Sequence, residues 1–472
     1  MKRIIVGLVG AGVVAYGGVV AFLQHFDHET APRLTAVSPT NKNPVALAAF
    51  NVLSDARCDY CHATGRELPF YFHVPVANQL MEKDLVQGRR HFRIEPVLEA
   101  FEKGVPPSEE QLSRIEEVIV QNRMPPTLYL LMHWHAHLSN ADRQAVLTWV
   151  RDTRERYYAD TGAAPAFAGE PVRPVPEQIA VNNAQVVLGR KLFFDTKLSG
   201  DNGLSCASCH DLNRGGVDHL KTATGIGGQK GPINVPSVYD AYFKIAQFWI
   251  GRAPDLAAPA AGTVMNPGEM GSHDWGAVAD KLNGDPEYAG LFKAAFGPAV
   301  AIDQQSITTA IAEFEKTLIT PDSPFDDYLK GKKDAISPQA IRGYERFKAI
   351  GCSGCHSGIG LGGGAYEAMG LEGDYFKDRG GPVTDADEGR YTVTHADGDR
   401  YRFVVPNLRN IDQTAPYFHD GSANTLEEAV RKMAHYQTPD ANPSEQDVTD
   451  IVAFLKTLTG RYDGHSLADM KP

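Results

Sequence analysis

The chain has 472 residues, with 43% hydrophobic and 22% charged residues, which is the composition of a folded globular protein rather than a disordered one. Its length predicts about three domains. The formal net charge of −12 argues against a nucleic-acid partner, because such proteins present basic surfaces.

The N-terminus carries an uncharged run from Ile4 to Leu23 after Lys2 and Arg3, which is about long enough to cross a bilayer as a helix. A cleaved signal peptide is the alternative, but its apolar region would be shorter and its cleavage site clearer. We therefore predict an uncleaved membrane anchor over residues 1–27. Because positive residues stay in the cytoplasm, we expect a single inner-membrane span with the bulk of the protein in the periplasm.

Three Cys-x-x-Cys-His pentads contain all six cysteines of the chain. Two thiols at this spacing can add to the vinyl groups of a haem, and the adjacent His then becomes an axial ligand of the iron. No cysteine remains for a disulfide, a zinc site or a thiol nucleophile. We therefore predict three covalently bound haem c groups. Their attachment residues are Cys58 and Cys61, Cys206 and Cys209, and Cys352 and Cys355, with His62, His210 and His356 as iron ligands.

Residues 28–160 are predicted to form an N-terminal c-type haem domain. Apolar residues at helical spacing before Cys58, and again from Ser139, predict two helices that bracket the haem. Between them, prolines follow Met124 and hold an extended loop. Met124 is the predicted sixth iron ligand. The alternatives are a core Met at this position, or Met81 or Met132 as the ligand.

Residues 161–179 are rich in Pro, Ala and Gly and predict a semi-rigid linker. Similar helical patterns precede the second and third pentads, so we predict two repeats of one haem unit, over residues 180–322 and 323–472. An apolar stripe predicts a helix over 303–318. A final helix is predicted after Ser444, which begins an approximate capping box. The predicted fold class is mainly α, with three c-type cytochrome haem domains after one N-terminal transmembrane helix.

The sixth ligand separates an electron-transfer haem from a reactive one. An iron bound by His and Met is coordinatively full, whereas an iron with one open face can bind peroxide or oxygen. Met433 is the predicted sixth ligand of the His356 haem, although the sequence does not separate it from Met369. Near the second pentad, His219 is the obvious strong candidate ligand.

Residues from about 180 to 460 resemble the bacterial dihaem cytochrome c peroxidases. The resemblance rests on four strings, Gly231-Pro232-Ile233-Asn234, Ala246-Gln247-Phe248-Trp249, the run 318–325, and Thr414-Ala415-Pro416-Tyr417-Phe418-His419. The additional N-terminal haem module and anchor resemble the trihaem, membrane-anchored members of that family, which are quinol peroxidases.

The resemblance implies different roles for two of the haems. The His210 haem would be the low-potential, peroxidatic centre. The His356 haem, with Met433, would be the high-potential centre that supplies electrons. Trp249 matches the Trp that the family places between these two haems.

The resemblance also implies an acid–base residue and a metal ion. Glu269 matches the distal carboxylate, which can move a proton between the two peroxide oxygens for about 10²–10⁴-fold in rate. Asn234 matches a side-chain ligand of a calcium ion at the domain junction. The carbonyl oxygens of Thr414 and Pro416 would complete its protein contacts.

The chain departs from the family pattern at two places. Ile226 stands where many members have a His that closes the peroxidatic iron, so we expect an open iron in the fully oxidised protein. Pro259 stands where the family often has a Gln in the distal pocket, which leaves more of the work to Glu269.

Together these expectations predict an enzyme that reduces hydrogen peroxide to water. Electrons would pass from a quinol or a small electron-donor protein through the His62/Met124 haem and the His356/Met433 haem to the His210 haem. The alternatives are a membrane-anchored electron relay without catalysis, and a dihaem enzyme that oxidises protein side chains. No quinol pocket can be read from the residues, and homodimerisation is left open.

Overall fold

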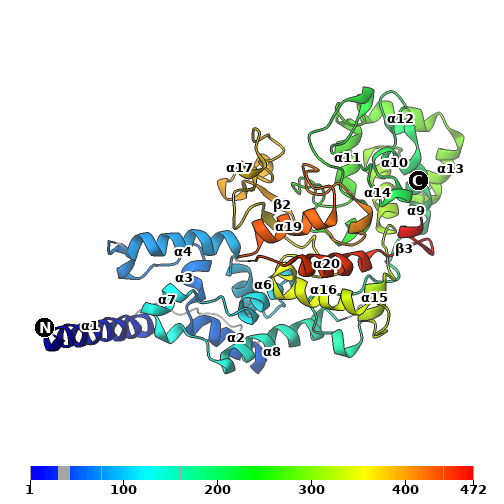
Figure 1. The fold of residues 1–472 in the computed structure, drawn as a ribbon. Coiled ribbons are helices and arrows are strands. Elements are labelled where there is room, and N and C mark those ends of the chain that lie inside the picture. Colours follow the sequence, from blue (N-terminus) through cyan, green and yellow to red (C-terminus); the bar gives the residue numbers. More distant parts are fainter. Residues whose placement is uncertain (1, 30–42, 76, 160–161, 440, 471–472) are drawn as a thin grey trace. The chain divides into compact units, whose positions relative to one another are not determined.

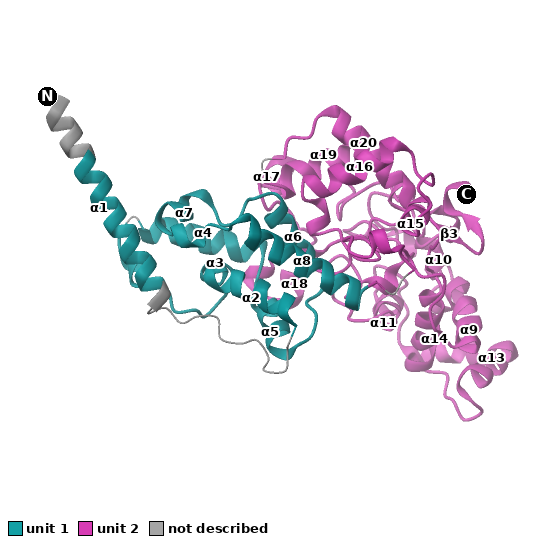
Figure 2. Cartoon of the chain, turned by 90° about the horizontal axis from the view of Figure 1, so that it is seen from below, with its two compact units in different colours: residues 1–158 teal, residues 159–472 magenta. Residues whose placement is uncertain are grey.

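The computed structural model describes residues 2–29, 43–75, 77–159, 162–439 and 441–470, and these are mainly helical (Figure 1). The prediction of a mainly α fold is confirmed. The chain forms two compact units, Met1–Tyr158 (unit 1) and Ala159–Pro472 (unit 2) (Figure 2).

Unit 1 contains the first pentad on a short helix, held within a small helical core. Phe101 and Trp149 stack in this core with ring centroids 4.9 Å apart. Ser139 and Asp142 form a capping box at the start of α8, as the pattern after Ser139 predicts. The helices are α1 (Lys2–Glu29), α2 (Pro44–Asp55), α3 (Cys58–His62), α4 (Ala77–His91), α5 (Glu95–Lys103), α6 (Glu109–Val120), α7 (Thr127–Met132) and α8 (Asn140–Tyr157).

Helix α1 includes the run predicted as a membrane anchor. Among the helices that the structure describes, none is both long and apolar enough to cross a membrane. The predicted transmembrane helix and inner-membrane location are therefore wrong. The side chains described for this helix run from Gly10 to Asp27, and those before Gly10 lie outside the described residues. Near its described end, Asp27 is only 3% exposed and accepts a hydrogen bond from the Tyr71 hydroxyl at 3.0 Å.

Unit 2 repeats one pair of closely packed helices. The pairs are α9 (Asn183–Phe194) with α14 (Gln304–Lys316), and α16 (Pro338–Ala349) with α20 (Glu445–Leu455). A Cβ atom on Gly189 would lie 1.9 Å from the Ala310 carbonyl oxygen, and one on Gly343 would lie 1.9 Å from that of Asp450. The same glycine contact thus closes both pairs, and the predicted repeat is present in the structure.

The rest of unit 2 consists of short elements around these pairs. β1 and β2 pair antiparallel, with Glu367 opposite Phe403, and β3 pairs antiparallel with β4. The helices are α10 (Cys206–Cys209), α11 (Ala257–Met265), α12 (Trp275–Asn283), α13 (Pro286–Phe296), α15 (Pro324–Leu329), α17 (Tyr375–Arg379), α18 (Tyr391–Thr394) and α19 (Leu426–Gln437). The strands are β1 (Tyr366–Ala368), β2 (Arg402–Val404), β3 (Arg461–Tyr462) and β4 (His465–Ser466).

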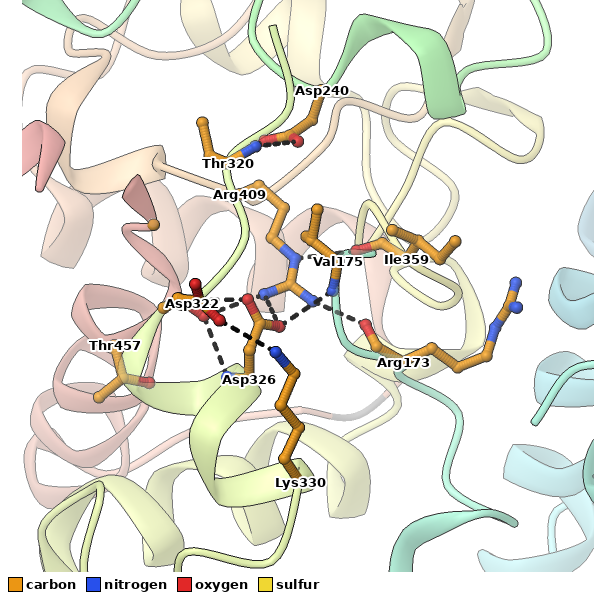
Figure 3. Close-up of polar contacts among 12 residues, drawn as sticks. Arg173, Val175, Asp240, Thr320, Asp322, Asp326, Lys330, Ile359, Arg409 and Thr457 are labelled. Atoms are coloured by element: carbon orange, nitrogen blue, oxygen red, sulfur yellow. Dashed lines mark hydrogen bonds and ion pairs between the residues drawn. The ribbon is translucent and has the colours of Figure 1, made fainter. Parts of the chain in front are cut away.

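A buried ion pair joins distant segments of unit 2 (Figure 3). Arg409 Nη1 lies 2.8 Å from Asp326 Oδ1, and both side chains are completely buried. Arg409 Nη2 also donates to the Arg173 carbonyl oxygen at 2.7 Å, and the Val175 amide donates to Asp326 Oδ1 at 3.2 Å. This part of the predicted linker is therefore packed into unit 2. The division of the unit at residue 322 stays a prediction.

Candidate haem sites

The three pentad histidines share one hydrogen-bond pattern, in which Nδ1 faces a backbone carbonyl oxygen. These contacts are His62 with Gly88 and Phe92 at 3.0 Å each, His210 with Gly216 at 3.2 Å, and His356 with Leu361 at 2.9 Å. A ring nitrogen that faces a carbonyl carries the proton, so Nε2 keeps its lone pair for a metal. The chain therefore holds three imidazoles in the tautomer that an iron requires.

None of the six cysteines forms a disulfide. Burial raises the pKa of Cys58 and Cys206 to about 12, and that of Cys61 and Cys209 to about 11. Thiols with such pKa values are poor thiolate ligands at neutral pH. Paired thiols next to an oriented imidazole fit the covalent attachment of haem c.

A cavity in unit 2 is lined by the cysteines and the His of the third pentad. Met433, the predicted sixth ligand, lines the same cavity, and so does Met369. The Met369 sulfur accepts a hydrogen bond from Gln437 Nε2 at 3.8 Å. The structure brings both candidates to the haem site, and Met369 is the one whose sulfur has a protein partner.

The residues predicted for the junction also line this cavity. Trp249 donates its indole N–H to the Asn234 carbonyl oxygen at 2.9 Å. The Asn234 side-chain amide donates to the Leu220 carbonyl oxygen at 2.9 Å, which leaves its Oδ1 as an acceptor. Thr414 and Pro416 lie in the same wall. Because the described residues contain no cluster of three His, Cys, Asp or Glu side chains suited to a metal, a cation here would rest on amide and carbonyl oxygens.

Glu269 lies beside the second pentad. The Ile226 amide, in the loop 224–231, donates to the Glu269 carbonyl oxygen at 2.7 Å. The raised pKa of Cys209 has burial as its main cause, and the charges of Asp218 and Glu269 raise it further. The structure thus places Glu269 near the second pentad, and its acid–base role stays a prediction.

The Glu269 carboxylate has two described partners. Asn266 Nδ2 donates to Oε1 at 3.0 Å, and Arg252 Nη2 lies 3.5 Å from the same oxygen. The Arg252 guanidinium lies over the Phe248 ring, 3.9 Å from its centroid. The sequence analysis missed Arg252, although it stands only three residues after Trp249, where one of the strings that carry the resemblance ends.

Both ring nitrogens of His219 contact the backbone. Its Nδ1 lies 2.9 Å from the Ala415 carbonyl oxygen, and its Nε2 lies 3.0 Å from that of Arg214. Both ring nitrogens therefore face backbone oxygens. Ile226, at the place of the family's closing His, packs its side chain beside Gly271.

Two further residues from the sequence analysis are half-buried. Met124 lies between α6 and α7, and none of the described contacts joins it to His62. Its role as sixth ligand stays a prediction, as do the alternatives Met81 in α4 and Met132 in α7. Pro259 lies in α11, before the turn that carries Glu269.

Three family comparisons match successive parts of the chain. Residues 15–152 match the haem-binding domain family, residues 183–334 the di-haem cytochrome c peroxidase family, and residues 340–459 the cytochrome c family. The prediction of three c-type cytochrome domains is therefore wrong, because two such domains are found, one of them a haem-binding domain. The middle segment inserts α11, α12 and α13 between its pentad and α14, and these helices share a core with α9. It is thus more than a minimal cytochrome.

Individual proteins show the same relationship. The chain is 42% identical over 461 residues to a cytochrome c peroxidase of Escherichia coli K12, and this alignment covers 97% of this chain and 96% of that protein. It is 44% identical over 308 residues to the cytochrome c551 peroxidase of Nitrosomonas europaea, covering 65% and 89%. The crystal structure of a MauG-like protein associated with microbial copper homeostasis aligns with a TM-score of 0.55 at 28% identity, covering 61% of this chain and 93% of that one. The chain therefore belongs to the bacterial di-haem cytochrome c peroxidase family, a family of haem peroxidases.

Proposed function

We propose that this protein reduces hydrogen peroxide to water at the haem attached to Cys206 and Cys209. The observation that carries the proposal is that one loop touches both Cys209 and Glu269: Cys209 Sγ lies 4.0 Å from the Thr224 carbonyl oxygen, and the Ile226 amide donates to the Glu269 carbonyl oxygen. Both ring nitrogens of His219 are turned to backbone oxygens. The Glu269 carboxylate is therefore available for proton transfer, whereas His219 is not available as a sixth ligand of the iron. The overall reaction consumes one peroxide, two protons and two electrons and yields two water molecules.

The proposal includes three haem c groups, one for each oriented pentad histidine. When bound, the His210 haem supplies the iron that binds peroxide and takes up oxidising equivalents. Glu269 accepts the proton of one peroxide oxygen and returns it to the other, which then leaves as water. Asn266 and Arg252 keep the carboxylate in place by contacts to Oε1. Oε2, for which no hydrogen bond to a described residue is formed, serves the proton transfer.

Electrons reach this site from the His356 haem, with Met433 as its sixth ligand. The two sulfurs support this assignment, because that of Met369 accepts a hydrogen bond from Gln437, whereas that of Met433 forms none with the described residues. Trp249 connects the His210 module (residues 180–322) to the His356 module (residues 323–472). Its indole N–H donates to the Asn234 carbonyl oxygen of its own module, and its carbonyl oxygen accepts a hydrogen bond from the Val404 amide of the other at 2.8 Å. A calcium ion bound by Asn234, Thr414 and Pro416 would keep this junction rigid.

Electrons enter the protein through the N-terminal haem domain, from a quinol or a small redox protein. A buried polar group close to the first pentad favours a quinol. Asp27 Oδ2 lies 3.6 Å from His133 Nε2, and its Oδ1 accepts a hydrogen bond from Tyr60 at 3.3 Å. A quinol releases protons with its electrons and needs such an acceptor, whereas a protein donor does not. Comparing a quinol analogue with a reduced small cytochrome as reductant distinguishes the two.

The proposed function is tested by replacing Glu269. The reduced protein is mixed with hydrogen peroxide, and haem reoxidation is followed by stopped flow. Because the carboxylate carries the proton transfer, Glu269→Gln is expected to slow reoxidation by about 10²–10⁴-fold. The matched control is Glu287→Gln, which removes an exposed carboxylate paired with Lys191 in the same module and should react like wild type. Slow reoxidation of the wild type itself would favour an electron relay without catalysis.

A further inference from the structure

We propose that Arg252 is a positioning residue for peroxide cleavage, which holds the Glu269 carboxylate from the loop that also carries Trp249. The inference rests on the proposed acid–base role of Glu269. One short loop would then carry both Trp249, the residue between the two haem modules, and Arg252, the residue that orients Glu269.

The backbone of this loop has a well-defined shape. The Gln247 amide donates to the Ala253 carbonyl oxygen at 2.8 Å, and the Gly251 amide donates to the Phe248 carbonyl oxygen at 3.1 Å. Phe248 has a φ of +65°, a left-handed conformation that bulky residues rarely adopt. In this conformation the Phe248 ring forms the platform on which the Arg252 guanidinium lies.

The guanidinium and one amide share a single oxygen of the carboxylate. Arg252 Nη2 lies 3.5 Å from Glu269 Oε1, and Asn266 Nδ2 donates to the same Oε1 at 3.0 Å. With Oε1 held from two sides, the carboxylate cannot rotate without losing both contacts. Oε2 is thereby presented in one orientation, which a proton carrier requires.

A second copy of the loop shows that the arginine is not needed to build it. The Tyr417 amide donates to the Ala423 carbonyl oxygen at 2.7 Å, and Phe418 has a φ of +73°. These features match the first loop position by position, and Ser422 stands in the place of Arg252. The guanidinium is therefore present in the copy next to Glu269, while the copy in the His356 module forms the same turn without it.

The contact with Glu269 is not a major source of stability. The side chains of Arg252 and Glu269 are 39% and 34% exposed, and ion pairs at such exposure contribute little to folding. Replacement of Arg252 should therefore leave the fold intact. Its effect should appear in the chemistry that Glu269 performs.

The test is a double-mutant cycle on the holoprotein, with peroxide-driven haem reoxidation as the measurement. Arg252→Gln is expected to lower the rate constant about tenfold, and to lower it less than about twofold when Glu269→Gln is already present. Arg252→Lys should fall between wild type and Arg252→Gln, because it keeps the charge but not the planar fork. In the steady state, kcat should fall while KM stays unchanged.

Arg190→Gln is the matched control. It removes an exposed arginine of the same module that lies 3.8 Å from Asp463, and it should react like wild type. The thermal midpoint and the haem absorption spectrum of Arg252→Gln should equal those of wild type, which shows that fold and haem environment are retained. If they do not, Arg252→Lys provides the comparison.

Three outcomes would overturn the inference. Equal losses from Arg252→Gln with and without Glu269→Gln would mean that Arg252 does not act through Glu269. Wild-type rates in Arg252→Gln would mean that the carboxylate needs no such support, although the peroxidase function would stand. A wild type that does not reoxidise with peroxide would remove the proposed function and the inference with it.

Discussion

The His210 and His356 modules of unit 2 use the same scaffold for different purposes. Each has a helix pair closed by a glycine contact, and each has a seven-residue turn with a left-handed Phe. The His210 module adds Glu269 and Arg252, whereas the His356 module adds Met433. Under the proposed function, the comparison teaches that the same backbone holds a haem in both modules, and that a few side chains near it decide between reaction and electron transfer.

The His356 module also has a polar network around the turn that corresponds to the Trp249 loop. His419 takes the place of Trp249, stacks on Phe403 with centroids 4.3 Å apart, and faces Asp387 through Nε2 at 2.9 Å. Arg379 donates to Asp387 at 2.7 Å. Most partners in this network belong to the segment that contains α17, β1 and β2. The turn with Phe248 and the turn with Phe418 therefore have the same backbone but different surroundings.

The largest expected effect comes from breaking the buried ion pair inside the His356 module, which also holds the segment that contains Arg173 and Val175. Arg409→Met leaves Asp326 buried without its cation, and this should lower the free energy of unfolding by about 3–5 kcal/mol. Urea denaturation measures the loss. Lys332→Met removes a cation that is 68% exposed from Asp327 and should cost less than about 1 kcal/mol. A loss of that small size for Arg409→Met would show that the buried pair does not stabilise this module.

The glycine contacts test whether the two helix pairs are equivalent. Gly189→Ala and Gly343→Ala each place a Cβ atom 1.9 Å from a carbonyl oxygen of the partner helix, so each should lower the free energy of unfolding by about 1–3 kcal/mol. Gly290→Ala in α13 meets no atom within 4 Å and should be neutral or stabilising by up to about 1 kcal/mol. Unequal losses at Gly189 and Gly343, measured by urea denaturation, would break the equivalence.

The smallest expected effect concerns the network of the His356 module. Burial opposes ionisation of Asp387, but hydrogen bonds from His419, Arg379 and Thr384 outweigh it and hold its pKa below the ordinary value. A depressed pKa stabilises the fold above the unfolded-state pKa, and this stabilisation is lost as the pH falls toward the folded-state pKa. Asp387→Asn should therefore lower the free energy of unfolding by about 1.5 kcal/mol at pH 7.

The pH dependence provides the check on this network. The difference between wild type and Asp387→Asn should shrink as the pH falls below about 4, where the unfolded carboxyl takes up its proton. Asp397→Asn, at a side chain that is 91% exposed, should match wild type throughout. A difference that stays constant with pH would show that the Asp387 charge does not stabilise the module.

Local patterns predicted the helices well. The stripe over 303–318 corresponds to α14, and the pattern after Ser444 corresponds to α20, with its capping box of Ser444 and Asp447. The membrane prediction rested on one apolar run, and it failed because none of the described helices is long and apolar enough to cross a membrane. Near the described end of α1, Asp27 accepts a hydrogen bond from Tyr71 of the same unit. An apolar run is compatible with a membrane or with a protein interior, and the packing of the folded chain decides between them.

The sequence by itself determined that the chain carries haem-attachment sites, because a Cys-x-x-Cys-His pentad contains its whole chemistry within five residues. Its resemblance to a family pointed to Glu269 and Trp249. Only the tertiary structure decided that Arg252 lies against Glu269, that both nitrogens of His219 are occupied, and that Met433 shares a cavity with His356. Most of these contacts join residues that are not neighbours in the sequence. They depend on tertiary packing, which a local sequence pattern does not predict.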